Sequence, residues 1–94
     1  MLLTMINLER EIKLLERHII VLKKIIEKEP IGIMKLSKEV KIPMHQVRYS
    51  MRILQESGFL SPTTRGAMTN TKARFFLKEF EQHKNRLIKR LKRV

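Results

Sequence analysis

The segment from residue 36 to residue 60, LSKEVKIPMHQVRYSMRILQESGFL, constrains the fold more than any other part of this 94-residue chain. Its pattern predicts a short helix, a tight turn at residues 41–43 and a longer helix over residues 43–57. Pro43 suits the first turn of the longer helix, where a missing N–H costs little, and Gly58 suits the position just after its end. The apolar residues of this helix recur at helical spacing, and we expect them to be buried: Met44, Val47, Met51 and Leu54.

The opposite face of the longer helix carries polar, basic and aromatic side chains, namely His45, Gln46, Arg48, Tyr49 and Arg52. Arg can form two hydrogen bonds with guanine O6 and N7, and Gln can pair in the same way with adenine. A helix that packs on a second helix and presents such residues is typical of a DNA-reading surface. Arg52 lies a turn further along and is expected to meet phosphate rather than a base. The alternative interpretation is an ordinary solvated helix face.

Apolar periodicity and the positions of Pro and Gly predict the remaining elements. Within a hairpin, short strands at 59–61 and 67–69 are expected to flank a turn at residues 62–66 that contains Gly66. The chain is thus expected to be mainly α with a small β-hairpin, in a single domain spanning 1–94. In order, the expected elements are a long N-terminal helix, the helix pair, the hairpin and a final helix: residues 5–28, 33–58, 59–69 and 71–93.

These segments resemble the winged helix-turn-helix regulators of the MarR/ArsR-like kind, especially the small archaeal predicted transcriptional regulators. IGIMKLSKEV resembles their positioning helix, IPMHQVRYSMRILQESGFL their recognition helix and first wing strand, and SPTTRGAMT their wing. The strong part of the resemblance covers residues 31–71. It implies a winged helix-turn-helix flanked by long helices, which binds double-stranded DNA. Two residues depart from the pattern: Lys41 replaces the usual turn glycine, so a positive φ there would carry a modest cost, and Ser50 stands where a bulkier apolar residue is common.

The resemblance also implies roles outside the recognition helix. The positioning helix of such proteins crosses the DNA backbone, so Lys35, Lys38 and Lys41 are expected to contact phosphates without reading sequence. The wing tip carries Thr64 and Arg65, and an arginine there can enter the minor groove and respond to its width. A turn residue in water is the alternative for Arg65.

The first and last helices carry broad apolar stripes. Their residues recur at intervals of three and four: Leu8, Ile12, Leu15, Ile19 and Leu22 in the first helix, and Phe76, Phe80, Leu87 and Leu91 in the last. Because a chain of this length buries only a small core, we expect these stripes to form the seam of a homodimer, supplied by either helix. A two-fold dimer would place two recognition helices about 34 Å apart, which predicts a palindromic site.

The net charge of +12 comes from 21 Lys and Arg residues against nine Glu, with no Asp. Nucleic acid is the commonest partner for such an excess, ahead of a membrane surface or a merely solvated basic protein. Residues 72–94 hold nine of the basic groups and two of the acidic ones, so most of the excess lies outside the helix pair. The cations at the chain end are either the solvated side of a dimerising helix or additional phosphate contacts: Lys84, Arg86, Lys89, Arg90, Lys92 and Arg93.

No pattern in the sequence indicates an enzyme, a cofactor or a metal site. His18, His45 and His83 are scattered and have no second ligand at metal spacing, no glycine-rich phosphate loop occurs, and Cys is absent. No uncharged apolar run approaches the roughly 20 residues that a membrane span needs, and nothing resembles a signal peptide. A cytoplasmic, nucleoid-associated protein is therefore expected. The Lys-, Glu- and Ile-rich composition weakly favours a thermophilic source.

The favoured function is a homodimeric, sequence-specific transcriptional regulator. One alternative is a protein-interaction module of the transcription or repair machinery, but such a face would expose apolar residues instead of Arg48 and Tyr49. The other alternative is a sequence-blind architectural DNA binder, which the basic C-terminal helix favours. The sequence shows no separate sensor domain, so an effector would bind at the dimer seam or be absent.

Overall fold

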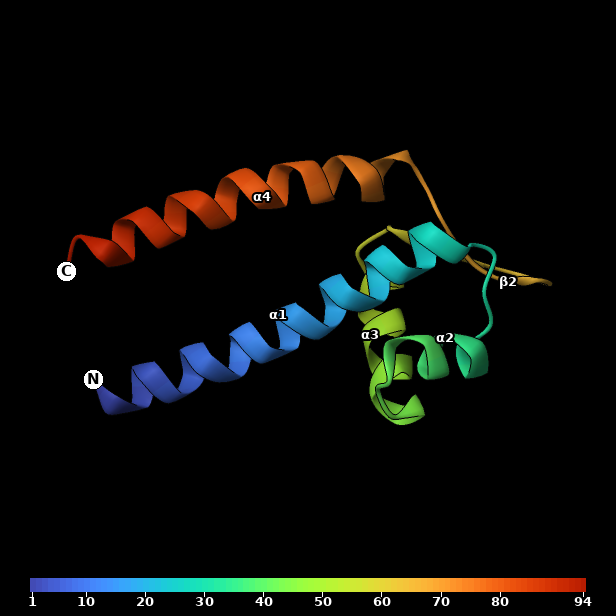
Figure 1. Cartoon of the computed structure of the whole chain (residues 1–94), viewed down its shortest axis with the longest axis horizontal. Helices are drawn as coiled ribbons and strands as arrows, with labels where there is room; N and C mark the ends of the chain where they lie inside the picture. The colour runs from blue at the N-terminus through green and yellow to red at the C-terminus, as the bar shows by residue number, and fades with distance from the viewer.

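Four helices and one β-hairpin make up the protein in this computed structural model, which describes residues 1–94 (Figure 1). The expectation of a mainly helical chain with a hairpin after three helices is confirmed. The first helix begins at Leu2, three residues earlier than expected. None of the helices combines the length and apolar character needed to cross a membrane. In chain order the elements are α1 (Leu2–Lys28), α2 (Ile33–Val40), α3 (Met44–Glu56), β1 (Leu60–Thr63), β2 (Gly66–Thr69) and α4 (Thr71–Lys92).

The turn between α2 and α3 depends on Lys41, whose backbone adopts the left-handed conformation with φ 57° and ψ 41°. The N–H groups of Lys41 and Ile42 both donate to the carbonyl oxygen of Ser37. The Ser37 hydroxyl in turn donates to the Ile42 carbonyl at 2.5 Å. A non-glycine residue in this conformation costs about 1–2 kcal/mol, and these hydrogen bonds offset that cost. Lys41 therefore has the positive φ that its place in the turn suggested from the sequence.

The hairpin has a shorter turn than expected. β1 and β2 pair antiparallel with Thr63 opposite Gly66, so only Thr64 and Arg65 lie between the strands. The prediction of a five-residue turn at 62–66 is wrong, because Pro62 and Thr63 of one strand still pair with Ala67 and Gly66 of the other. The proline of β1 is tolerated because β1 is an edge strand, where a missing N–H interrupts no further ladder.

A third backbone segment pairs with the other side of β2. The Ile31 N–H donates to the Ala67 carbonyl at 3.3 Å, and the Ala67 N–H donates to the Ile31 carbonyl at 2.9 Å. Gly66 permits this approach, because a Cβ at that position would lie 2.5 Å from the Ile31 carbonyl carbon. The sequence does not predict this bridge, since one bridging residue leaves no alternating pattern.

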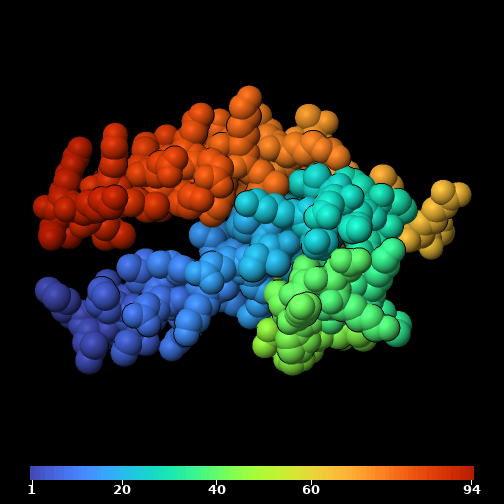
Figure 2. Space-filling model, viewed as in Figure 1, coloured from blue at the N-terminus to red at the C-terminus, as the bar shows by residue number.

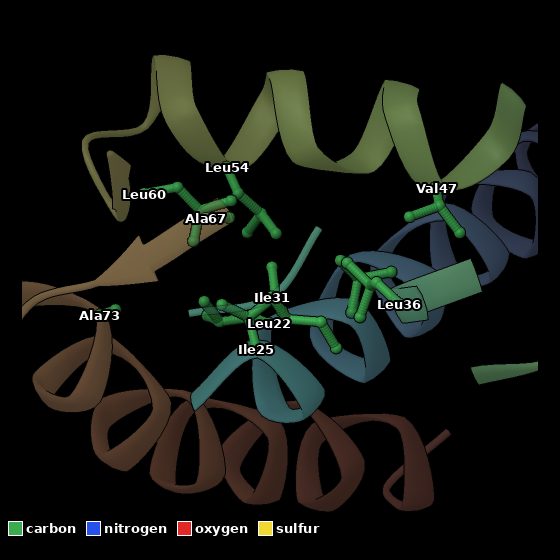
Figure 3. Close-up of a cluster of buried hydrophobic side chains, with 10 residues drawn as sticks. Leu22, Ile25, Ile31, Leu36, Val47, Leu54, Leu60, Ala67 and Ala73 are labelled. Carbon is green, nitrogen blue, oxygen red and sulfur yellow. The ribbon is translucent and has the colours of Figure 1, made fainter. Parts of the chain in front are cut away.

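The buried core lies where α1 passes between α3 and α4 (Figure 3). Burial of Val47 and Leu54 is confirmed, whereas Met51 is half-buried and Met44, the first residue of α3, is 38% exposed. The core consists of ten side chains drawn from every element: Val21, Leu22, Ile25, Ile31, Leu36, Val47, Leu54, Leu60, Ala67 and Ala73.

The apolar stripe of α1 changes its role along the helix. Leu22 was expected at a dimer seam, but its side chain is fully buried in the core, which corrects that expectation. Ile19 is also buried, at 7% exposed, whereas Leu8 and Ile12 remain 42% and 43% exposed. A continuous stripe looks the same along its whole length in sequence. Only the positions of α2, α3 and the hairpin decide which part of it is covered.

The N-terminal half of α1 and the C-terminal half of α4 extend beyond the core as two antiparallel arms (Figure 1). Both chain ends lie at the same end of the molecule, opposite the hairpin, and the principal extents are 49 × 26 × 21 Å. The space-filling view shows that side chains leave a gap between the tips of the arms (Figure 2).

Glu29, just after α1, links three elements. Its carboxylate accepts hydrogen bonds from the Thr69 N–H at 2.9 Å, the Thr69 hydroxyl at 2.8 Å and Arg74 Nη2 at 2.9 Å. Burial opposes ionisation of this carboxyl, but the bonds from Thr69 and the charge of Arg74 outweigh it and hold the pKa of Glu29 below its ordinary value. The side chain thus ties the end of α1 to β2 and to the start of α4.

Candidate nucleic-acid interface

The residues that α3 buries determine which of its side chains remain free. Val47, Ser50 and Leu54 face the core, so the other sides of the helix turn towards solvent. The predicted reading residues lie there: four are exposed and Gln46 is half-buried. We call these five residues the α3 face: His45, Gln46, Arg48, Tyr49 and Arg52.

The cations of the α3 face are not held in strong internal ion pairs. Arg48 makes no salt bridge. Arg52 Nε lies 4.0 Å from Glu56 Oε1, and both side chains are about two-thirds exposed. A solvent-exposed pair at this distance contributes little, so both guanidinium groups are available to an anionic ligand.

Tyr49 is supported on two sides. The Arg52 guanidinium carbon lies 5.1 Å from the centre of the Tyr49 ring, within the range of a cation–π contact. The ring of His18, from α1, lies 5.9 Å away at an interplanar angle of 41°. These contacts reduce the side-chain freedom that Tyr49 would lose on meeting a ligand.

A hydrogen bond between α1 and α3 lies directly beneath the α3 face. Ser50 is the one polar residue among the buried side chains, and its Oγ lies 2.8 Å from His18 Nδ1. Burial and the neighbouring charge of Arg17 lower the pKa of His18, which favours the neutral imidazole. Arg17 Nη1 also donates to the Gln46 carbonyl at 3.4 Å. Two consecutive residues of α1 therefore contact the backbone or buried side of α3.

Ser50 departs from the expected pattern in the sequence, but nothing in the sequence pairs it with His18. Ser50 follows Val47 by three residues and precedes Leu54 by four, so it belongs to the apolar side of α3. A hydroxyl at such a position needs a hydrogen-bond partner. A serine on the apolar side of a helix therefore indicates a buried hydrogen bond, but the sequence does not indicate which residue is the partner.

The remaining predicted phosphate contacts lie on two other elements. Lys35, Lys38 and Lys41 are exposed on α2 and at its C-terminal end, and α2 packs directly against α3. Thr64 and Arg65 are exposed at the tip of the hairpin, which projects from the end of the molecule opposite the chain termini (Figure 1). The three lysines therefore belong to the helix that packs against α3, and the hairpin tip lies on a separate element.

The hairpin tip has a defined shape. The Thr63 hydroxyl accepts a hydrogen bond from the Arg65 N–H at 3.2 Å and donates one to the Gly66 carbonyl at 2.6 Å. These bonds brace the two-residue turn and leave the Arg65 side chain in solvent.

The facing sides of the two arms form a second candidate surface, an apolar groove of about 1100 Å³. Several of its side chains are incompletely covered, with Leu87 46% and Leu91 60% exposed. Charged groups, among them Glu16, Lys23 and Lys84, also line it. Eight of the nine predicted dimerisation residues line the groove, and Leu22 does not: Leu8, Ile12, Leu15, Ile19, Phe76, Phe80, Leu87 and Leu91.

The structure contains no group of three His or acidic side chains placed to hold a metal ion. Comparison of the sequence with protein-family models and with curated proteins returns no match.

Proposed function

We propose that this protein is a winged helix-turn-helix regulator that binds double-stranded DNA in a sequence-specific manner. In this proposal α2 and α3 form the helix-turn-helix, and the α3 face enters the major groove. The hairpin is the wing, and Ile31 serves as the short third strand that pairs with it. The proposal assigns the chain to the winged-helix class on the order and pairing of these elements.

The observation that carries the proposal is the free, cationic side of α3. Arg48 is exposed and unpaired, beside Tyr49 and Arg52, which hold each other in contact. An α-helix, about 10–12 Å across with its side chains, fits the width of the major groove, and α3 offers 13 residues of helix to it. Its Arg and Gln side chains suit the hydrogen-bonding pattern of the base edges there.

The α2 lysines and the wing supply contacts that add affinity. Lys35, Lys38 and Lys41 would meet phosphates beside the groove that α3 occupies, and Arg65 would reach a neighbouring minor groove. Backbone contacts of this kind position a protein on DNA, whereas the α3 face would select the sequence.

We further propose that the protein acts as a homodimer joined through the groove between its arms. The groove exposes large apolar side chains, including Leu87 and Leu91, on a chain whose core holds only ten buried residues. A second copy would cover these side chains and would place two α3 faces at one palindromic site.

Selection of binding sites from random duplex DNA by the full-length protein tests the regulator proposal. We expect enrichment of a palindromic sequence that binds about 10³-fold or more tightly than random DNA. Arg48→Ala should cost about 1–3 kcal/mol on the selected site and relax base preference at one position. Arg10→Ala, on the exposed arm of α1, is the matched control and should keep the preference.

Failure to enrich any sequence would contradict the regulator proposal. Tight binding without enrichment would instead support a sequence-blind architectural protein, which the cations of α4 favour. Absence of DNA binding at about 50 mM and about 200 mM salt would leave the protein-interaction module.

A further inference from the structure

The side of α4 that faces away from the groove carries a row of cations. Successive residues of an α-helix are offset by about 100°, so most of these cations fall on the side of α4 opposite the groove-lining side chains. Arg86 lies at the edge of that side, with its Nη2 3.2 Å from Nδ1 of the groove-lining His83. All five cations are exposed, and none forms a salt bridge. We call this set the outer stripe: Lys78, Arg86, Lys89, Lys92 and Arg93.

Few acidic side chains lie near the outer stripe to neutralise its positive charge. Glu79 is the nearest acid on that side of the helix, and no acidic side chain follows Glu81. Arg86, Lys89 and Arg93 are three and four residues apart, which is the spacing at which like charges on a helix repel. A polyanion lying along the stripe would remove this repulsion.

The outer stripe and the α3 face lie on opposite sides of the molecule. Two different views place α1 between α3 and α4 (Figures 1 and 3), and the C-terminal part of α4 runs away from the core. A straight duplex held against α3 therefore has α1 and the core between it and the stripe. The cations of α4 cannot serve the same stretch of straight DNA.

We propose that the outer stripe binds the phosphate backbone of a second DNA duplex, so that the protein bridges two duplexes. The proposal rests on the proposed function for the first duplex. From Lys78 to Arg93 the stripe spans about 22 Å, the rise of six to seven base pairs. Closure of the groove by a second copy leaves the stripe exposed, because the stripe points away from the groove.

The composition of the stripe favours DNA over an anionic membrane. A helix that lies on a membrane inserts an apolar side between its cations. The apolar side of α4, with Phe80, Leu87 and Leu91, instead lines the groove. Phe75 is the one large apolar side chain on the outer side. Phosphates along a duplex need only a row of cations.

A two-duplex capture assay tests this proposal. A duplex carrying the selected site is fixed on beads, full-length protein is added, and capture of a labelled random duplex from solution is measured. The stripe variant carries Arg86→Gln, Lys89→Gln and Arg93→Gln. The control variant carries Arg10→Gln, Lys13→Gln and Lys28→Gln, which remove the same charge from exposed positions of α1. Circular dichroism checks that both variants are folded.

The stripe variant should capture the second duplex about tenfold less well or worse, while binding the fixed duplex with unchanged base preference. The control variant should capture like the wild type. Equal capture by the stripe variant and the control would overturn the proposal. So would a wild type that captures no second duplex, or one that binds anionic phosphatidylserine vesicles through the stripe but no second duplex.

The two proposals fail in different ways. If random-site selection enriches nothing, the regulator proposal fails, yet stripe-dependent capture can still be measured with any fixed duplex. If selection succeeds and capture does not depend on the stripe, only the bridging proposal fails.

Discussion

His18 Nδ1 of α1 lies 2.8 Å from Ser50 Oγ of α3, and this hydrogen bond joins the helix that forms one arm to the helix that carries the α3 face. Ser50 is completely buried and His18 is half-buried. The imidazole also packs beside Tyr49. The orientation of the α3 face therefore depends on α1, although the two residues stand 32 positions apart in the sequence.

Ser50→Ala should lower the free energy of unfolding by about 1–2 kcal/mol, because it leaves His18 Nδ1 without its partner. Urea denaturation followed by circular dichroism measures this change. Ser57→Ala is the matched control, since Ser57 is exposed at the end of the same helix, and should change stability by less than about 0.5 kcal/mol. A loss of less than about 0.5 kcal/mol for Ser50→Ala would show that the buried bond contributes little to stability.

Stability should fall as the solution is acidified from about pH 7.5 to about pH 5, in part through His18. Burial and Arg17 lower the pKa of His18 in the folded protein. Between that pKa and the ordinary value the unfolded chain binds more protons, so unfolding becomes easier as pH falls. His18→Gln keeps a hydrogen-bonding side chain and should reduce the slope of stability against pH. An unchanged slope would count against a role for His18 in this dependence.

Glu29→Gln should cost about 1–3 kcal/mol, because the carboxylate holds Thr69 and Arg74 with charge-assisted bonds. Glu27→Gln removes an exposed partner of Lys24 and should cost at most about 0.5 kcal/mol. The pKa of Glu29 is lowered, so its contribution is complete above the ordinary value of about 4.3 and is lost as pH falls below it. The free energies of unfolding of the wild type and the Glu29→Gln variant, measured as the pH is lowered, should therefore converge at low pH.

Gly66→Ala should destabilise the hairpin by more than about 2 kcal/mol. The residue has φ 128°, and the added methyl would meet the backbone of Ile31, which cannot move aside cheaply. Gly32→Ala is the control, because a Cβ there meets nothing within 4 Å, and it should be nearly neutral. Thermal unfolding of the two variants separates these outcomes, and a similar melting temperature for both would contradict the close approach of Ile31 to β2.

Leu87→Glu should convert the proposed dimer into a monomer of 11.3 kDa while leaving the fold intact. The side chain is 46% exposed in one chain, so the charge is tolerated there, but it would be buried against a second copy. Phe75→Glu changes an exposed side chain outside the groove and should leave the dimer unchanged. Light scattering after size-exclusion chromatography measures the mass. A wild-type mass equal to one chain would reject the dimer.

The local elements and the chemistry of the α3 face can be predicted from the sequence. Helical spacing of Val47 and Leu54 fixed the buried side of α3, and therefore fixed which side carries Arg48 and Tyr49. Pro43 and Gly58 marked the ends of that helix within one residue or two. These features are readable because periodicity, capping and turn chemistry act over a few neighbouring residues.

Which distant residues meet depends on the packing of the whole chain. It paired His18 with Ser50 and Ile31 with Ala67, and it divided the α1 stripe between the core, which holds Leu22, and the open groove. It also placed the basic side of α4 away from the α3 face. The physical reason is that burial and pairing between segments far apart in the chain depend on how whole helices pack. An apolar stripe or a buried hydroxyl can be recognised in the sequence as a group that requires a partner, but the packing of the helices determines which residue is that partner.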